Sequence, residues 1–123
     1  MKKIQLQVNE FCLQAVLYDT PAGQAIWDSL PISAKGNLWG DEIYFSIDAR
    51  VKMENGREVV EEGDLGFWPP GSAFCIFYGL TPVSSPGEIR PASPVEVVGK
   101  IIGDYKVLKQ VKSTPKVTIT PSE

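Results

Sequence analysis

The sequence contains no histidine and no long apolar run, and each of these two absences excludes a class of function. It contains only two cysteines. Without histidine the chain lacks the usual proton shuttle at neutral pH, the Ser-His and Cys-His triads, and the ligand of most zinc sites. No apolar run approaches the ~20 residues that a membrane-spanning helix needs, and the opening MKKIQLQVNE lacks the apolar region of a signal peptide. These absences predict a cytoplasmic chain with no membrane partner, no metal and no cofactor.

Charge of either sign is present only in moderation. Twelve Lys and Arg residues oppose 15 Asp and Glu residues, which gives a net charge of −3. No basic stripe stands out, so nucleic acid is not an expected partner. At 123 residues and 43% hydrophobic content, the chain is expected to form a single domain over residues 1–123 with a sizeable core.

The two cysteines are Cys12 and Cys75. In a reducing compartment both are expected to be small, buried, apolar residues. A disulfide between them stays open as an alternative, because separation in the sequence does not give the distance between the two thiols.

Alternating apolar residues predict many short strands. The first two form a hairpin across Asn9 and Glu10, and the last is expected to close the sheet against the first. The interval Leu80–Pro94, rich in proline and serine, predicts a long surface loop. Strands are expected at residues 4–8, 11–17, 43–47, 65–68, 73–78, 95–102 and 116–120.

Two short helices interrupt these strands. Thr20 is expected to cap the first helix, Pro21 to begin it and Pro31 to end it. A second short helix is expected over residues 104–111. The first helix carries a small apolar stripe, suited to covering the end of a barrel, at Ala22, Ala25, Ile26, Ser29 and Leu30.

Two turns carry specific expectations. Asn55-Gly56 predicts a type I′ hairpin between residues 51–54 and 57–60. Pro70-Gly71 matches the centre of a type II turn, which requires positive φ at Gly71. The strand that follows, at residues 73–78, is apolar on both faces, which predicts a barrel strand covered by a helix. Many short strands and frequent turns favour an all-β barrel over a sandwich.

Three segments resemble the small prokaryotic cyclophilin-like domain proteins: NLWGDEIYF (Asn37–Phe45), VEEGDLGFWPPGSAFCIFYGLTP (Val60–Pro82) and PASPVEVVGKI (Pro91–Ile101). The pattern GD-x-G-[FY]-WPPG followed by an apolar strand is the most specific part. The resemblance covers nearly the whole chain, in order. It implies a closed antiparallel β-barrel of about eight strands with two short helices, in a family whose members are mostly of unassigned function.

The fold name suggests peptidyl-prolyl isomerase activity, but fold does not imply function. Isomerases of the eukaryotic cyclophilin type use an Arg, a Gln, aromatic residues and a His in their groove. The local motifs around that Arg and Gln are not found in this sequence, and histidine is absent. No isomerase residue is therefore carried over, and a divergent isomerase is the alternative function.

The leading hypothesis is a binding protein whose aromatic pocket is lined by Trp39, Tyr44, Trp68 and Tyr78. It would bind a small organic molecule or a short peptide without catalysis. Assembly with a second copy of the chain through an aromatic surface is a third hypothesis.

Two charged residues are added to this predicted pocket. Glu42 lies beside the aromatic strand and could do acid–base work if it were desolvated. Arg90 lies in the long loop, where its guanidinium could clamp a carboxylate or carbonyl at the mouth of the pocket.

Overall fold

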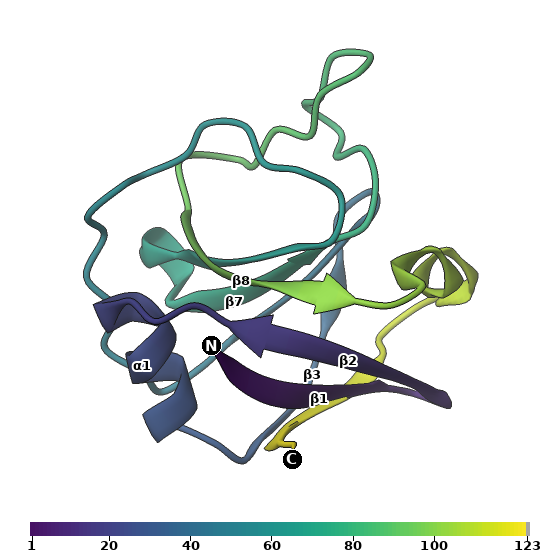
Figure 1. The fold of residues 1–123 in the computed structure, drawn as a ribbon. Coiled ribbons are helices and arrows are strands. Elements are labelled where there is room, and N and C mark those ends of the chain that lie inside the picture. The colour runs from purple at the N-terminus through teal and green to yellow at the C-terminus, as the bar shows by residue number, and fades with distance from the viewer. Residues whose placement is uncertain (123) are drawn as a thin grey trace.

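A nine-stranded antiparallel sheet curls into a nearly closed barrel in the computed structural model, which describes residues 1–122 (Figure 1). The predicted all-β barrel is confirmed, and residues 1–122 form nine strands, one α-helix and two short 3₁₀-helices. The helical segments are α1 (Pro21–Asp28), η1 (Pro69–Gly71) and η2 (Tyr105–Gln110). The strands are β1 (Lys2–Val8), β2 (Phe11–Leu17), β3 (Ile32–Lys35), β4 (Asn37–Leu38), β5 (Glu42–Ser46), β6 (Asp64–Trp68), β7 (Ala73–Phe77), β8 (Glu96–Ile102) and β9 (Lys116–Pro121).

The spatial order of the strands is β3-β9-β1-β2-β8-β6-β7-β5-β4. Its two outermost members, β3 and β4, are consecutive in the chain and are joined by Gly36. A Cβ atom on Gly36 would lie 2.8 Å from the Ile43 side chain, so only glycine lets the chain pass there undisturbed. The N–H of Gly36 donates to the Pro115 carbonyl at 2.7 Å. The chain itself thereby links the two edges of the sheet.

The predicted opening hairpin and closing strand are confirmed. β1 pairs with β2 over its whole length, and Asn9 supplies the left-handed turn residue with a φ of 52°. β9 pairs with the other edge of β1. The side-chain oxygen of Asn9 accepts from the N–H of Lys116 at 2.9 Å, which ties the hairpin turn to the start of β9.

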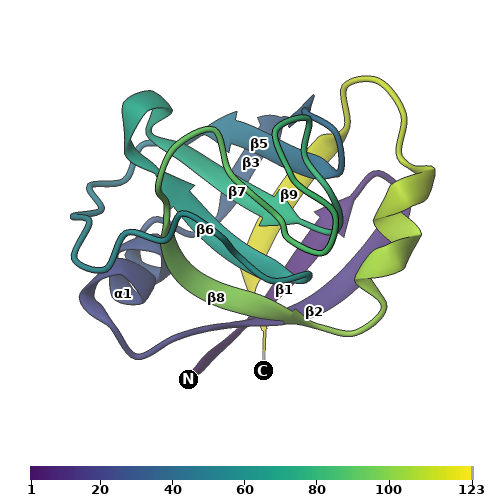
Figure 2. The same cartoon turned by 90° about the horizontal axis from the view of Figure 1, so that it is seen from above.

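The helix α1 begins as the sequence predicts but ends at Asp28, before the Ser29 and Leu30 that the predicted stripe includes. Thr20 Oγ1 accepts from the N–H of Gly23 at 3.0 Å, and Pro21 is the first helical residue. Ala22 and Ile26 are buried in the barrel core. Figures 1 and 2 show α1 and η2 on opposite sides of the barrel. No helix within residues 1–122 is long and apolar enough to cross a bilayer.

The predicted Asn55-Gly56 hairpin is wrong. Neither residue has positive φ, and the surrounding segment forms no strand pair with itself. Instead, the buried carboxylate of Glu96 accepts hydrogen bonds from the backbone N–H groups of Glu54 at 2.8 Å and Asn55 at 2.9 Å. These charge-assisted bonds to a residue of β8 determine the turn in place of its local sequence preference.

The predicted positive φ at Gly71 is also wrong. Pro69–Gly71 is a 3₁₀ turn, and the left-handed residue is Ser72, with a φ of 46°. The N–H of Ser72 donates to the Pro69 carbonyl at 3.1 Å. A Cβ on Gly71 would lie 3.0 Å from the indole ring of Trp68. Glycine is therefore needed here for close packing against Trp68.

β7 is buried on both faces, as its apolar sequence predicts. Phe74 and Ile76 point into the barrel core, whereas Ala73, Cys75 and Phe77 belong to a second cluster outside it. This outer cluster is completed by Val60, Ile89 and Val95. The cover is made by loops, visible over β6 and β7 in Figure 2, and not by the expected helix.

The two cysteines occupy different environments. Cys75 is buried, as expected, but Cys12 is exposed, and both thiols are free. The side chain of Cys12 points outward from β2, whereas that of its neighbour Leu13 points into the barrel. The expectation of two buried cysteines is therefore wrong for Cys12, and the open alternative of a disulfide is not found.

Candidate functional site

Four of the six predicted site residues surround one cavity of about 240 Å³. The cavity lies outside the barrel, between the start of β5, the end of β6 and the loop before β8. It is lined by Trp39, Glu42, Tyr44, Trp68, Pro91, Ala92 and Val95.

The β4–β5 hairpin presents the first wall. Trp39 and Glu42 exchange backbone hydrogen bonds of 2.9 and 3.2 Å across the turn. Successive side chains of a strand alternate between its faces. Ile43 and Phe45 therefore point into the core, and Glu42 and Tyr44 line the cavity.

Trp68, at the end of β6, forms the opposite wall. Its indole Nε1–H donates to Ser93 Oγ at 2.6 Å, and the ring is half-buried. The next residue, Pro69, begins the 3₁₀ turn, and Gly71 packs against the ring edge. The indole is thus fixed by a hydrogen bond on one side and by a rigid turn on the other.

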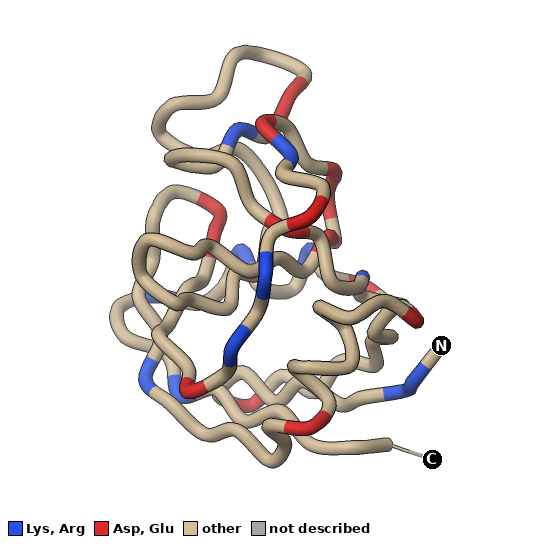
Figure 3. Tube along the Cα trace, turned by 90° about the vertical axis from the view of Figure 1, so that its left-hand side faces the viewer, with Lys and Arg blue, Asp and Glu red and all other residues tan. Residues whose placement is uncertain are grey.

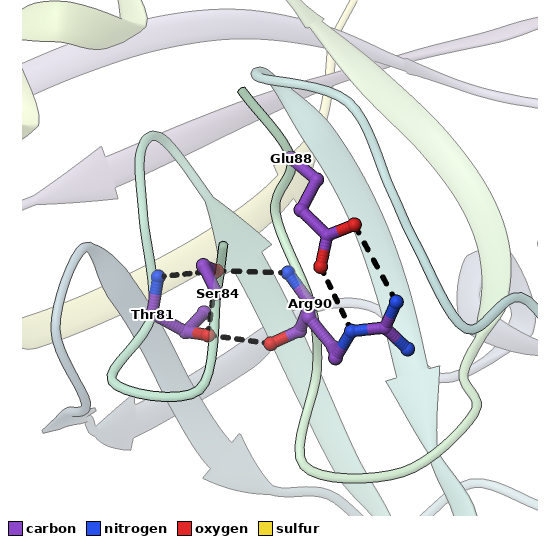
Figure 4. Close-up of polar contacts among 4 residues, drawn as sticks. All are labelled: Thr81, Ser84, Glu88 and Arg90. Atoms are coloured by element: carbon purple, nitrogen blue, oxygen red, sulfur yellow. Dashed lines mark hydrogen bonds and ion pairs between the residues drawn. The ribbon is translucent and has the colours of Figure 1, made fainter. Parts of the chain in front are cut away.

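The third wall is Pro91-Ala92, and the backbone of Arg90, which precedes it, is held by Thr81 and Ser84 (Figure 4). The Thr81 hydroxyl donates to the Arg90 carbonyl, and Ser84 Oγ accepts from the Arg90 N–H at 2.9 Å. Ser84 Oγ also accepts from the Thr81 N–H at 3.0 Å. Two hydroxyl groups therefore position the backbone immediately before the cavity wall.

The side chain of Arg90 does not line the cavity. Its Nε donates to the Glu88 carboxylate at 2.9 Å, within the same loop (Figure 4). The hypothesis placed a cationic clamp at the mouth of the pocket, but no basic residue is among those that line it. The loop contributes its backbone and apolar side chains, and the guanidinium is engaged by the adjacent carboxylate.

Tyr78 is also absent from the cavity wall. Only 2% of its surface is exposed, and it belongs to the barrel core. It continues the inward alternation of Phe74 and Ile76, so its ring is directed away from the outer face. Burial, with a smaller contribution from nearby carboxylates, raises the pKa of Tyr78 to about 12.

Among residues 1–122, Glu42 is the one acidic residue in the cavity wall, and 5% of its surface is exposed. Burial raises the pKa of its carboxyl group from 4.5 to about 7, and the neighbouring Cys75 thiol opposes this shift. That thiol has the Ala73 carbonyl as its hydrogen-bond acceptor, at 3.8 Å, so it supports the carboxylate only weakly. Within residues 1–122, no basic side chain forms an ion pair with Glu42. Near neutral pH the cavity therefore holds a carboxyl group that exists in both protonation states.

A second hollow, of about 680 Å³, is lined in part by the residues that follow β7 and by the loop before β8. It includes Asp41, the exposed Glu61 and Glu62, and Lys109, whose Nζ lies 3.6 Å from Asp41 Oδ2. Figure 3 shows acidic and basic positions interspersed along the chain. Exposed carboxylates of this kind are hydrated and interact weakly. Among the described residues no group of three potential metal ligands occurs.

Sequence reasoning missed the apolar wall of Pro91, Ala92 and Val95, and the hydroxyl groups that position the loop and Trp68. The signal for the wall was present, because PASPVEVVGKI is one of the segments that carry the resemblance. The apolar residues that follow Arg90, and not its charge, contribute to the cavity wall.

Comparison with known proteins identifies the fold. A family model described as cyclophilin-like matches residues 2–120. The solution structure of the hypothetical protein AF2241 from Archaeoglobus fulgidus is 37% identical, with a TM-score of 0.80, over 98% of this chain and 95% of that one. The structure of McbB in complex with tryptophan is 15% identical, with a TM-score of 0.71, over 97% of this chain and 44% of that one, and shows a likeness of fold alone. A search of curated proteins found no match. The chain belongs to the cyclophilin-like family.

Proposed function

We propose that this protein binds a small organic molecule, or one side chain of a short peptide, in the aromatic pocket, and that it does so without catalysis. The observation that supports this proposal is the convergence of Trp39, Tyr44 and Trp68 on one cavity beside a buried carboxyl group. An apolar concavity with few polar groups is the usual form of a small-molecule site.

The size of the cavity limits the ligand. A volume of about 240 Å³ corresponds to roughly eight water molecules at about 30 Å³ each. Sites for drug-sized molecules begin at roughly 300 Å³. The pocket therefore suits a single ring or a single side chain, with the remainder of a larger ligand outside.

Its walls are preorganised. The indole of Trp68 is hydrogen-bonded to Ser93, and the backbone of Arg90 is held by Thr81 and Ser84. Binding to such a site loses little conformational entropy, because the walls are ordered before the ligand arrives. A small ligand can then reach measurable affinity with few contacts.

A fragment titration followed by two-dimensional NMR tests the proposal. We expect compounds of one-ring size to shift the indole N–H signals of Trp39 and Trp68. Trp68→Ala should weaken their binding by about tenfold, the value of one stacked aromatic contact. The control Trp27→Ala, in α1 outside the pocket, should leave the affinity unchanged. The proposal fails if no compound moves either indole signal, or if Trp68→Ala and Trp27→Ala behave alike.

The alternative of a proline isomerase is tested separately. The isomerase mechanism uses an arginine beside the proline nitrogen, and the residues that line this cavity include no basic side chain. We therefore expect micromolar protein to leave the relaxation of proline peptides at its spontaneous rate, with time constants of roughly tens to hundreds of seconds. A protease-coupled assay measures this. Acceleration that disappears in Trp68→Ala would establish the isomerase instead.

A further inference from the structure

Resting on the proposed function, we propose that the pocket recognises a cationic nitrogen, namely the protonated or methylated ammonium group of a small amine or of a lysine side chain. The observations that lead to it are the composition of the walls, the burial of one carboxyl group and the position of the nearby basic residues.

Three aromatic rings reach the cavity from two different parts of the sheet. Trp39 and Tyr44 come from the β4–β5 hairpin, and Trp68 comes from the end of β6. The face of an aromatic ring carries partial negative charge and attracts cations, most strongly in tryptophan. Several such rings around one small volume form the kind of cage that selects alkylated ammonium groups.

Glu42 adds a full carboxyl group to this cage. It is 5% exposed, lines the cavity, and within residues 1–122 has no ion-pair partner. Two basic side chains of neighbouring segments are occupied by other carboxylates, Lys109 by Asp41 and Arg90 by Glu88. A buried carboxylate is unfavourable unless a cation accompanies it. A ligand ammonium would provide the partner that the protein does not.

A cationic ligand needs Glu42 in its ionised form. A ligand with a carbonyl or carboxylate group would instead need Glu42 in its protonated form. The titratable group that faces Glu42 from β7 is the Cys75 thiol, and the Tyr78 phenol beyond the end of β7 lies in the barrel core. Burial raises the pKa of both groups, so they stay neutral over the range in which the Glu42 carboxyl group, with a pKa of about 7, titrates. The dependence of affinity on pH therefore distinguishes the two kinds of ligand, since a cation binds better as Glu42 ionises.

The experiment compares choline with 3,3-dimethylbutan-1-ol, a neutral molecule of the same shape, by NMR titration of the Trp39 and Trp68 indole signals. At about pH 8 we expect choline to bind about tenfold more tightly than the alcohol. At about pH 5.5 the choline affinity should fall by about threefold, to the contribution of the rings alone, because only a few per cent of Glu42 is ionised there, while the alcohol affinity should not change.

Glu42→Gln keeps the size of the side chain and removes its charge. In this variant the preference for choline should shrink to the contribution of the rings, about threefold, and its dependence on pH should vanish. Equal binding of choline and the alcohol by the wild-type protein would overturn the inference and leave the proposed function standing. Binding of neither probe at the indoles, up to about 10 mM, would overturn the inference. The fragment titration decides the proposed function independently.

A second arm identifies the source of the cation. A blocked pentapeptide with a central trimethyllysine between glycines is titrated beside choline. If the affinity of the peptide exceeds that of choline by about tenfold or more, the contacts outside the cavity are used and the natural ligand is a lysine side chain. Equal affinities assign the pocket to a free small amine. If the peptide and choline both bind no better than the neutral alcohol, the pocket does not recognise ammonium groups.

Discussion

Glu42→Gln is expected to stabilise the protein by about 3 kcal/mol near pH 8 and to leave its stability almost unchanged near pH 4. The reason is the burial of the Glu42 carboxyl group, which raises its pKa from 4.5 to about 7. A carboxylate that is harder to ionise in the folded chain than in the unfolded chain opposes folding whenever the pH favours ionisation. Glutamine has nearly the same shape and carries no charge at either pH.

The direction of the effect follows from proton binding. Below about pH 4.5 the group is protonated in both states and costs nothing. As the pH rises, the unfolded chain releases this proton first, so the stability of the folded chain decreases until the pH passes about 7. Above that value the loss is complete and constant.

Urea unfolding at about pH 4, 6 and 8, followed by tryptophan fluorescence, measures this prediction. Burial also raises the pKa of Asp64, so the difference between variant and wild type is more informative than either curve alone. Glu10→Gln, in the exposed β1–β2 turn, is the control and should stay within about 0.5 kcal/mol of the wild type at every pH. Parallel curves for Glu42→Gln and the wild type would contradict the prediction.

The barrel could be predicted because most of its strands show, in their own sequence, the alternation that distinguishes the buried face from the exposed one. The alternation in β1 and β2 specifies which face is buried, and a shift of one residue would expose the whole apolar set. The cap at Thr20 and the proline after it determine the start of α1 by local hydrogen bonding and sterics. Local signals of this kind do not depend on distant parts of the chain.

The two turns that were wrongly predicted show the limit of local signals. Asn55-Gly56 favours a tight hairpin in isolation, but Glu96, some forty residues later, binds the backbone N–H groups of this segment. Pro70-Gly71 favours a type II turn, but the 3₁₀ turn allows Gly71 to pack on Trp68. In both cases a tertiary contact outweighs a preference of about 1 kcal/mol, and such a contact is not visible in the local sequence.

The candidate site was predictable where strand alternation applies. Glu42 and Tyr44 are two residues apart, and the alternation places them on one face. Tyr78 was misplaced because β7 is apolar on both sides, so its sequence does not show which residues point inward. Arg90 was misplaced because the direction of a loop side chain depends on its partner, here Glu88.

The side chains of β7 are divided between the barrel core and the outer cluster, and the loss of a large side chain from the core is expected to lower the stability strongly. Phe74→Ala is expected to destabilise the protein by about 3–5 kcal/mol, because the fully buried ring lies inside the barrel and leaves a cavity that the sheet cannot close. Its ring centroid lies 5.7 Å from that of Phe45, and the two strands that carry these rings pair directly. This loss is a large fraction of the free energy of unfolding of an ordinary domain. The midpoint of urea unfolding should therefore move to a lower urea concentration, while the slope of the free energy against urea concentration stays constant.

The matched control for Phe74→Ala is Cys75→Ala, at the next position on the opposite face of the same strand. Cys75 is just as buried, but alanine removes a single sulfur atom, and we expect a loss of about 1 kcal/mol. Equal losses in the two variants would contradict the assignment of Phe74 to the barrel interior and Cys75 to the outer cluster.

The two positions also differ in their effect on the pocket. Phe74→Ala enlarges the barrel core and should leave ligand affinity unchanged in the folded protein, whereas Cys75→Ala changes the surroundings of Glu42 and should alter the pH at which affinity changes.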